Sequence, residues 1–212
     1  LLNTSAKYNA SATTKDAETL KANIITNLTN YNTSTLQKFD SVFRFSKVST
    51  LIDGTDASIL SNITTIKIRK SLQPTINSSL KYNIYFRNGL YNPHTGHNST
   101  AGGILTSTGF KVSGNTNEQF LDDDGNGNVR AYYLSGATRV YTNSTQGTID
   151  YTTGAITINS LQVTEISNIR GSASSVIELT VQPASNDIVP ARDQIIALDI
   201  SNSTISVQND TF

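Results

Sequence analysis

An acidic run holds the residues best suited to binding a metal ion. It reads Asp122-Asp123-Asp124-Gly125-Asn126-Gly127. Asp122, Asp124 and Asn126 match positions 1, 3 and 5 of an EF-hand calcium loop, and the last glycine matches position 6. Position 12 would be Tyr133, which cannot supply the bidentate carboxylate, and no flanking helices are predicted. We therefore expect a glycine-rich β-turn that leads into a strand, with no metal site.

The two histidines, His94 and His97, would have to carry any imidazole chemistry, because the chain has no other histidine. Their spacing allows two ligands to one metal ion, but the chain has no cysteine, and no carboxylate stands close in sequence to complete a set. Serines and aspartates occur throughout, so their presence does not single out a catalytic triad. Neither Gly102-Gly103 nor Gly125-x-Gly127 precedes a predicted helix, as a phosphate loop would. The sequence therefore predicts loop histidines and no catalytic or cofactor-binding residues.

The charge balance argues against several classes of protein. Lys plus Arg and Asp plus Glu are 16 each, so the formal net charge is zero, whereas binding to nucleic acid or to a membrane surface usually needs a basic excess. No stretch approaches the ~20 apolar residues of a membrane span. Charged residues make up only 15 % of the chain, which suits a protein that packs against neighbours. No methionine occurs, even at position 1, and we expect an internal part of a longer polypeptide.

The N-terminal part is predicted to begin with an arm and a helix. Residues 1–14 are polar and unpatterned, which indicates a linker or arm. A helix is expected over residues 16–29, with Thr14 as its cap. One face of this helix carries apolar residues at helical spacing, namely Leu20, Ile24 and Leu28. We expect this face to pack against a sheet that contains Ile66 and Ile68.

Shorter elements are predicted up to residue 74. A short strand is expected around residues 36–39, and a short helix from Ser46, as its cap, to residue 52. Residues 59–72 place isoleucines among threonine, lysine and arginine in a β-type pattern. We therefore expect residues 15–74 to form a small α+β segment.

From residue 75 onward the pattern is typical of β-strands. Alternating apolar residues are broken by turn signals, among which Ser135-Gly136-Ala137 and Thr152-Thr153-Gly154 are expected to close hairpins. Further strands are expected at residues 163–169, 176–181, 194–200 and 204–207. The overall expectation is an α+β fold, in which residues 75–212 form a predominantly antiparallel β-rich domain.

Several segments carry a family resemblance through their order along the chain. They are residues 60–62, 66–70, 91–97, 121–130, 147–154 and 189–196. With the helices that precede them, they resemble the C-terminal region of the baseplate wedge subunit of T-even-like contractile-tailed phages, and the N-terminal third resembles the end of the baseplate J-like family. The resemblance covers nearly the whole chain beyond the first fifteen residues.

The resemblance implies a scaffold and not an enzyme. Such wedge subunits dimerise and join wedges into a ring around the tail hub, and the family offers no catalytic residues to carry over. The implied partners are other baseplate wedge proteins and copies of this chain within a six-fold assembly, with no nucleic acid and no membrane. The implied location is the tail baseplate of the virion, after assembly in the host cytoplasm.

A second hypothesis is a receptor- or glycan-binding β-module of a tail spike or surface adhesin. It would need exposed aromatic side chains in a groove, for which Tyr132-Tyr133 and the pair Tyr82 and Tyr85 are the candidates. An embedded hydrolase is a third and weaker hypothesis, since no residue pattern supports one.

Overall fold

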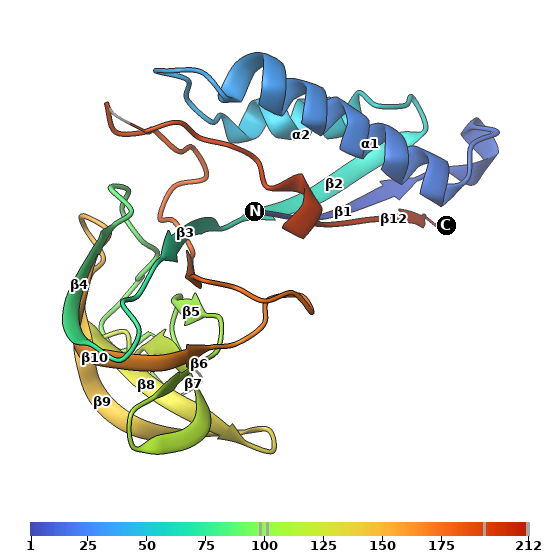
Figure 1. The fold of residues 1–212 in the computed structure, drawn as a ribbon. Coiled ribbons are helices and arrows are strands. Elements are labelled where there is room, and N and C mark those ends of the chain that lie inside the picture. Colours follow the sequence, from blue (N-terminus) through green and yellow to red (C-terminus); the bar gives the residue numbers. More distant parts are fainter. Residues whose placement is uncertain (98, 101, 193, 211–212) are drawn as a thin grey trace. The chain divides into compact units, whose positions relative to one another are not determined.

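The chain folds as two compact units. The computed structural model describes residues 1–97, 99–100, 102–192 and 194–210. The terminal unit combines Leu1–Lys67 with the segment that begins at Asn186. The inserted unit, Ile68–Ser185, interrupts the terminal unit along the chain. In Figure 1 the terminal unit carries the blue and red ends of the colour scale, and the inserted unit carries the greens, yellows and oranges.

A three-stranded sheet forms the base of the terminal unit. Its strands are β1 (Leu2–Tyr8), β2 (Ile59–Ile66) and β12 (Thr204–Asn209), in the order β12-β1-β2. Strand β1 pairs with β12 in parallel and with β2 in antiparallel orientation. Alternate side chains of β1 are buried, as expected for a strand with one covered face. The first residues of the chain are therefore the centre of this sheet.

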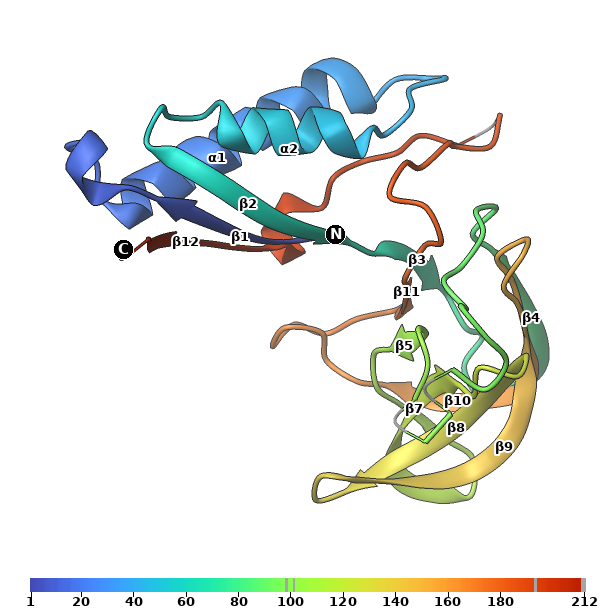
Figure 2. The ribbon, with the colours of Figure 1, turned by 180° about the vertical axis from the view of Figure 1, so that it is seen from behind.

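Two helices cover one face of the sheet, as Figures 1 and 2 show. Helix α1 (Ala17–Tyr31) begins after Asp16, whose carboxylate accepts a hydrogen bond of 2.7 Å from the backbone N–H of Thr19. The predicted apolar face of α1 is confirmed, since its three core residues are fully buried: Leu20, Ile24 and Leu28. Helix α2 is Phe45–Asp53, and a short π-helix, η2 (Asn32–Leu36), follows α1. Two 3-10 turns, η1 (Ala10–Ala12) and η3 (Ile200–Asn202), complete the unit.

The returning C-terminal segment is tied to the helices by side chains. Asp187 accepts a hydrogen bond of 2.9 Å from the backbone N–H of Phe45 and one of 2.7 Å from Nη1 of Arg44. It therefore caps the start of α2 from far along the chain, where the local sequence offers no cap. Asn32 exchanges two hydrogen bonds with the backbone of Leu198. These contacts fix the segment that leads into β12.

The inserted unit is a β-barrel with a small second sheet. The barrel sheet has the order β4-β10-β6-β7-β8-β9, and a further pairing between β9 and β10 closes it. Its strands are β4 (Ser79–Tyr85), β6 (Phe110–Val112), β7 (Asn115–Asp123), β8 (Asn128–Ser135), β9 (Thr138–Asp150) and β10 (Ala155–Ile166). The second sheet has the order β3-β11-β5, from β3 (Ile68–Leu72), β11 (Ile177–Val181) and β5 (Thr106–Ser107).

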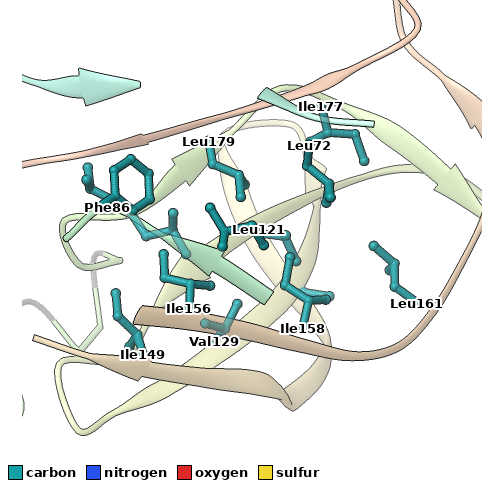
Figure 3. Close-up of a cluster of buried hydrophobic side chains, with 14 of the residues drawn as sticks. Leu72, Phe86, Leu121, Val129, Ile149, Ile156, Ile158, Leu161, Ile177 and Leu179 are labelled. Carbon is teal, nitrogen blue, oxygen red and sulfur yellow. The ribbon is translucent and has the colours of Figure 1, made fainter. Parts of the chain in front are cut away.

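Strand β10 closes the barrel because it bends. Its first half pairs with β9, placing Ile156 opposite Ile149, and its second half pairs with β6, placing Ile166 opposite Phe110. Between the halves the pairing with β4 shifts register, and Ser160 adopts a positive φ of 45°. One apolar core joins barrel side chains to Leu72, Ile177 and Leu179 of the second sheet, and ten of its residues are labelled in Figure 3.

The α+β class is confirmed, and so are the antiparallel pairing of the later part and its two predicted hairpins. The expected division of the chain differs from the structure at both ends. Residues 1–14 do not form a linker, because residues 2–8 are the central strand β1. The boundary expected at residue 74 lies at Lys67, and the chain returns to the terminal unit at Asn186. Both differences arise from strand pairing between distant segments.

Several local expectations were also wrong, among them the cap of α2, since Ser46 lies within that helix. Residues 59–72 form two strands in different sheets, so Ile66 and Ile68 do not share the sheet on which α1 packs. Residues 36–39 hold no strand, because the π-helix η2 extends to Leu36. The described residues of 194–200 form no strand either. The cap of α1 is Asp16 and not Thr14.

Candidate functional site

The three consecutive aspartates of the predicted turn have different partners. Asp122 and Asp123 end β7, and each is 1 % exposed, whereas Asp124 lies in the turn that precedes β8. Asp124 accepts hydrogen bonds from the backbone N–H of Asn126 at 2.8 Å and from Asn128 at 3.0 and 2.7 Å. Burial raises the pKa of Asp124, but the hydrogen bonds from Asn128 and Asn126 outweigh burial and leave this pKa below its usual value.

Asp122 is the centre of a buried ion cluster, defined by Asp122, Arg130, Arg139 and Tyr141. Arg130 donates to both carboxylate oxygens, through Nε at 2.9 Å and Nη2 at 3.2 Å. Arg139 and the hydroxyl of Tyr141 donate to Oδ2 at 2.7 and 2.9 Å. Four donors thus surround one carboxylate. A buried charge of this kind is tolerated only when it is paired and hydrogen-bonded.

One aromatic ring lies against each of the two arginines. The guanidinium of Arg130 lies 4.1 Å from the ring centre of Tyr141, and that of Arg139 lies 4.7 Å from that of Tyr132. Tyr132 also packs against Phe120 and Tyr141, with ring centres 5.7 and 5.8 Å away. Burial raises the pKa of Tyr132 and of Tyr141. Because Tyr132 is only 7 % exposed, it offers no open face for a sugar ring.

The cluster and Asp123 hold Ser99 and Leu105, in the connection between β4 and β5, against the barrel. Arg130 donates to the backbone carbonyl of Ser99 at 2.7 Å. Asp123 accepts hydrogen bonds from the backbone N–H of Leu105 at 2.8 Å and the hydroxyl of Tyr151 at 2.6 Å. Burial, and then the Asp123 carboxylate, raises the pKa of Tyr151. Asn92, earlier in the same connection, has a buried Oδ1 without a hydrogen-bond partner among the described residues.

Glycine at position 102 permits the backbone to lie close to the side chains of the ion cluster. Gly102 has a φ of +80°, and a Cβ there would collide with the guanidinium of Arg139 and crowd the carboxylate of Asp122. The donors and acceptors of the ion cluster therefore bind one another, and the cluster stabilises the fold of the inserted unit.

The described residues contain no group of three His, Cys, Asp or Glu side chains placed to hold a metal ion. The carboxylates of the acidic run instead accept hydrogen bonds from arginine, tyrosine, asparagine and backbone donors. That this turn binds no calcium stays a prediction.

The two histidines lie together in the connection between β4 and β5. Nε2 of His94 and Nδ1 of His97 are 3.3 Å apart, with the rings nearly perpendicular, and Tyr91 meets His97 edge-on. Ser99, which follows closely, donates its backbone N–H to Gly96. Within the part of the chain that the structure describes, no third ligand joins the pair.

The remaining aromatic candidates, Tyr82 and Tyr85, do not lie on one common surface. Tyr82 and Tyr85 stand an odd number of residues apart on β4, so their side chains point to opposite faces. Tyr82 accepts a hydrogen bond from the backbone N–H of Thr75 at 3.1 Å, and Tyr85 is 51 % exposed.

No helix among the described residues is long and apolar enough to cross a membrane.

Exposed apolar side chains of the terminal unit mark a second candidate, which sequence reasoning had not singled out. On strand β2, Leu60 is 50 % and Ile63 is 74 % exposed. Strand β2 is the outer strand of its sheet and pairs with β1 on one side only among the described strands. We call its other side the β2 edge, comprising residues 60–66.

The first third of the chain matches a known family. Residues 1–71 match the family model of the baseplate structural protein gp6, C-terminal domain III. This segment runs from β1 through both helices and β2 into β3. The match supports a phage baseplate protein with a structural role, and it does not distinguish the baseplate J-like family. No curated protein matches the chain.

Proposed function

We propose that this chain is a structural part of a phage tail baseplate wedge, which helps to assemble the baseplate ring through protein–protein contacts. The match of residues 1–71 to the C-terminal domain III of baseplate structural protein gp6 carries this proposal. The proposed location is the tail baseplate of the virion, and the proposed partners are other wedge proteins and further copies of the chain within a six-fold assembly.

The chemistry of the described residues supports a scaffold over an enzyme. The most heavily charged cluster, around Asp122, has its donors and acceptors matched internally. Such a cluster stiffens the barrel and has no spare group for acid–base work. Tyr82 and Tyr85 point to opposite faces of β4, and Tyr132 is buried, which gives the glycan-binding alternative no support.

The composition supports a protein that functions within an assembly. The chain has as many acidic as basic residues, and only 15 % of its residues are charged. Net charge helps to keep free proteins apart in solution, so a neutral chain is better suited to an assembly.

Purified virions of the phage that encodes the chain provide the test. We expect its peptides in intact tails and, after the tails are dissociated, in the fraction that contains baseplates. A phage with an early stop codon in this gene should yield particles that lack complete baseplates. Complete baseplates in that mutant, or peptides confined to fibres or to a soluble fraction, would overturn the proposal.

A further inference from the structure

The outward-facing backbone groups of the β2 edge can be identified from its pairing. Leu1 and Lys67 exchange two hydrogen bonds of 3.0 Å each, which makes them a hydrogen-bonded pair of the antiparallel ladder. Such pairs alternate with non-bonded pairs along the ladder. In the register that sets Ile63 opposite Ser5, residues 61, 63 and 65 therefore bond to β1. The N–H and C=O groups of Asn62, Thr64 and Ile66 face away from it, toward the open side.

The β2 edge lacks the features that usually protect outer strands. Its sequence, from Ile59 to Ile66, contains neither a charged residue nor a proline, and both are common means of preventing edge-to-edge pairing. The outer strand of the barrel, β4, does carry such a charge, at Lys81. The β2 edge has a register shift at Leu60, so only its far end is irregular.

On the open face of the sheet, Ile63 of the β2 edge is the most exposed apolar side chain. Ile63 is 74 % exposed, and its nearest neighbours on that face are small and uncharged, with Ser5 opposite and Ser61 and Thr65 two residues away on the same strand. Lys7, which lies diagonal to Ile63 on β1, forms an ion pair with Asp210 at 3.2 Å. An exposed isoleucine beside unpaired backbone groups favours the addition of another strand.

We propose that β2 pairs with β2 of a second copy of this chain, antiparallel and about a two-fold axis at Ile63. The two three-stranded sheets would then form one continuous sheet. This proposal rests on the proposed function, in which copies of the chain meet in the baseplate.

A two-fold axis at Ile63 satisfies the backbone pattern of both strands. Asn62 of each copy faces Thr64 of the other, so residues with outward-facing groups meet each other. Ile63 meets its own copy as a non-bonded pair, in which the side chains are closest.

A second copy also suits the charge and symmetry of this edge. An uncharged edge does not repel itself, whereas a basic or acidic edge would. An isologous contact uses the same edge twice and leaves no β2 edge open, so association through this edge stops at a dimer.

A single cysteine tests the register, because the chain has none of its own. Across a non-bonded pair the Cα atoms are about 4.5 Å apart, within the range for a disulfide. Ile63→Cys should therefore give a covalent dimer on mild oxidation. Ser61→Cys, on the same face, is the matched control and should not cross-link, because the axis places residue 61 opposite residue 65. Ser61→Cys combined with Thr65→Cys should restore cross-linking.

Analytical ultracentrifugation of the whole chain tests the energetics. We expect a concentration-dependent dimer, and Ile63→Lys should raise its dissociation constant about a hundredfold, since two apolar side chains lose their burial. Leu134→Lys, at a residue 50 % exposed in the inserted unit, is the control and should leave the dimer unchanged.

The possible results separate this proposal from the proposed function. A dimer that survives Ile63→Lys, together with an Ile63→Cys variant that does not cross-link, overturns pairing at the β2 edge. A wild-type chain that stays monomeric at about 100 micromolar overturns it too. Neither result moves the chain out of the baseplate, which the virion experiment decides by itself. Cross-linking of position 63 to another baseplate protein, with none to a second copy, also overturns self-pairing.

Discussion

At the scale of single residues, Asp122 has the most consequential surroundings. Its carboxylate is 1 % exposed and receives hydrogen bonds from two arginines and a tyrosine. The two arginines differ, because the side chain of Arg130 is 10 % exposed and that of Arg139 is 30 % exposed. The cluster therefore combines one largely enclosed ion pair with one that solvent partly screens.

Removing the charge of Asp122 should destabilise the inserted unit strongly. Asp122→Asn leaves the enclosed guanidinium of Arg130 without its counter-ion, which should lower the free energy of unfolding by about 3–5 kcal/mol. Arg139→Ala should cost roughly 1 kcal/mol, because that pair is partly exposed. Urea denaturation of both variants measures the difference. Equal costs would mean that the burial of Arg130 does not decide the energetics.

Calcium should leave the stability of the chain unchanged. The carboxylates of the acidic run already accept hydrogen bonds from internal donors, and a cation at Asp122 would have to displace an arginine. Ligand binding to the folded state raises its stability, so a thermal unfolding series with added calcium provides the measurement. We expect a shift in melting temperature below about 1 °C. A rise of several degrees would contradict this expectation.

Acid should destabilise the chain, and the direction follows from its aspartates. Five have a pKa below the usual value: Asp16, Asp56, Asp124, Asp150 and Asp187. Hydrogen bonds from the Lys15 side chain and from Ser58 lower the pKa of Asp56 to about 2. An unfolded aspartate has a pKa of about 3.9, so between these two values the unfolded chain binds more protons.

The stabilisation from these carboxylates is therefore complete above about pH 4 and is lost as the pH falls toward 2. Urea denaturation at a series of pH values measures it. Asp56→Asn should flatten this dependence, because the group no longer titrates. A stability that rises as the pH falls below 4 would show that other groups dominate.

At the scale of elements, α1 shows how one helix face holds the terminal unit together. Leu20, Ile24 and Leu28 are fully buried, while the helix carries polar residues on its outer side. Its first turn is capped by Asp16, and α2 is capped by Asp187 from the returning segment. Helix α1 thus depends on the core that its buried face joins, and α2 depends on the returning segment for its cap.

Truncating the buried face of α1 should be costly. Leu20→Ala or Ile24→Ala should lower the free energy of unfolding by about 2–4 kcal/mol, because each leaves a cavity in a fully buried position. Thr26→Ala, at an exposed position of the same helix, is the control. Chemical denaturation compares the three, and a change below about 0.5 kcal/mol at Leu20 would contradict the packing described here.

At the scale of the whole molecule, the sequence of the inserted unit interrupts the sequence of the terminal unit. The apolar core of the barrel draws only on residues of the inserted unit, from Leu72 to Val181. The terminal unit needs both ends of the chain, since β1 pairs with β12 and Asp187 caps α2. The inserted unit therefore supplies its own apolar core, whereas the terminal unit needs segments from both ends of the chain to fold.

Fragments should reveal this difference. Residues 68–185 expressed alone should unfold cooperatively, because their core is complete. Residues 1–71, the segment that matches the family model, should not, because they lack β12 and the cap of α2. Circular dichroism during thermal unfolding distinguishes the two outcomes. A cooperative transition in fragment 1–71 would show that β12 is dispensable.

Local signals determined much of this protein from its sequence alone. The spacing of Leu20, Ile24 and Leu28 predicted α1 and its buried face. Glycine turns at residues 135–137 and 152–154 predicted two hairpins of the barrel. Both features depend on neighbours a few residues apart, and such interactions can be read directly from the chain.

Only the tertiary structure decided which distant segments pair. Residues 1–14 looked like an arm because half of β1 faces the open side and is polar, and its partners begin near residues 59 and 204. Residues 59–72 looked like one strand because the β pattern continues through Lys67, where the chain changes units. The partners of Asp122 lie on β8 and β9. Pairing of this kind is set by the burial of whole faces against each other, so its energy belongs to no local stretch of sequence.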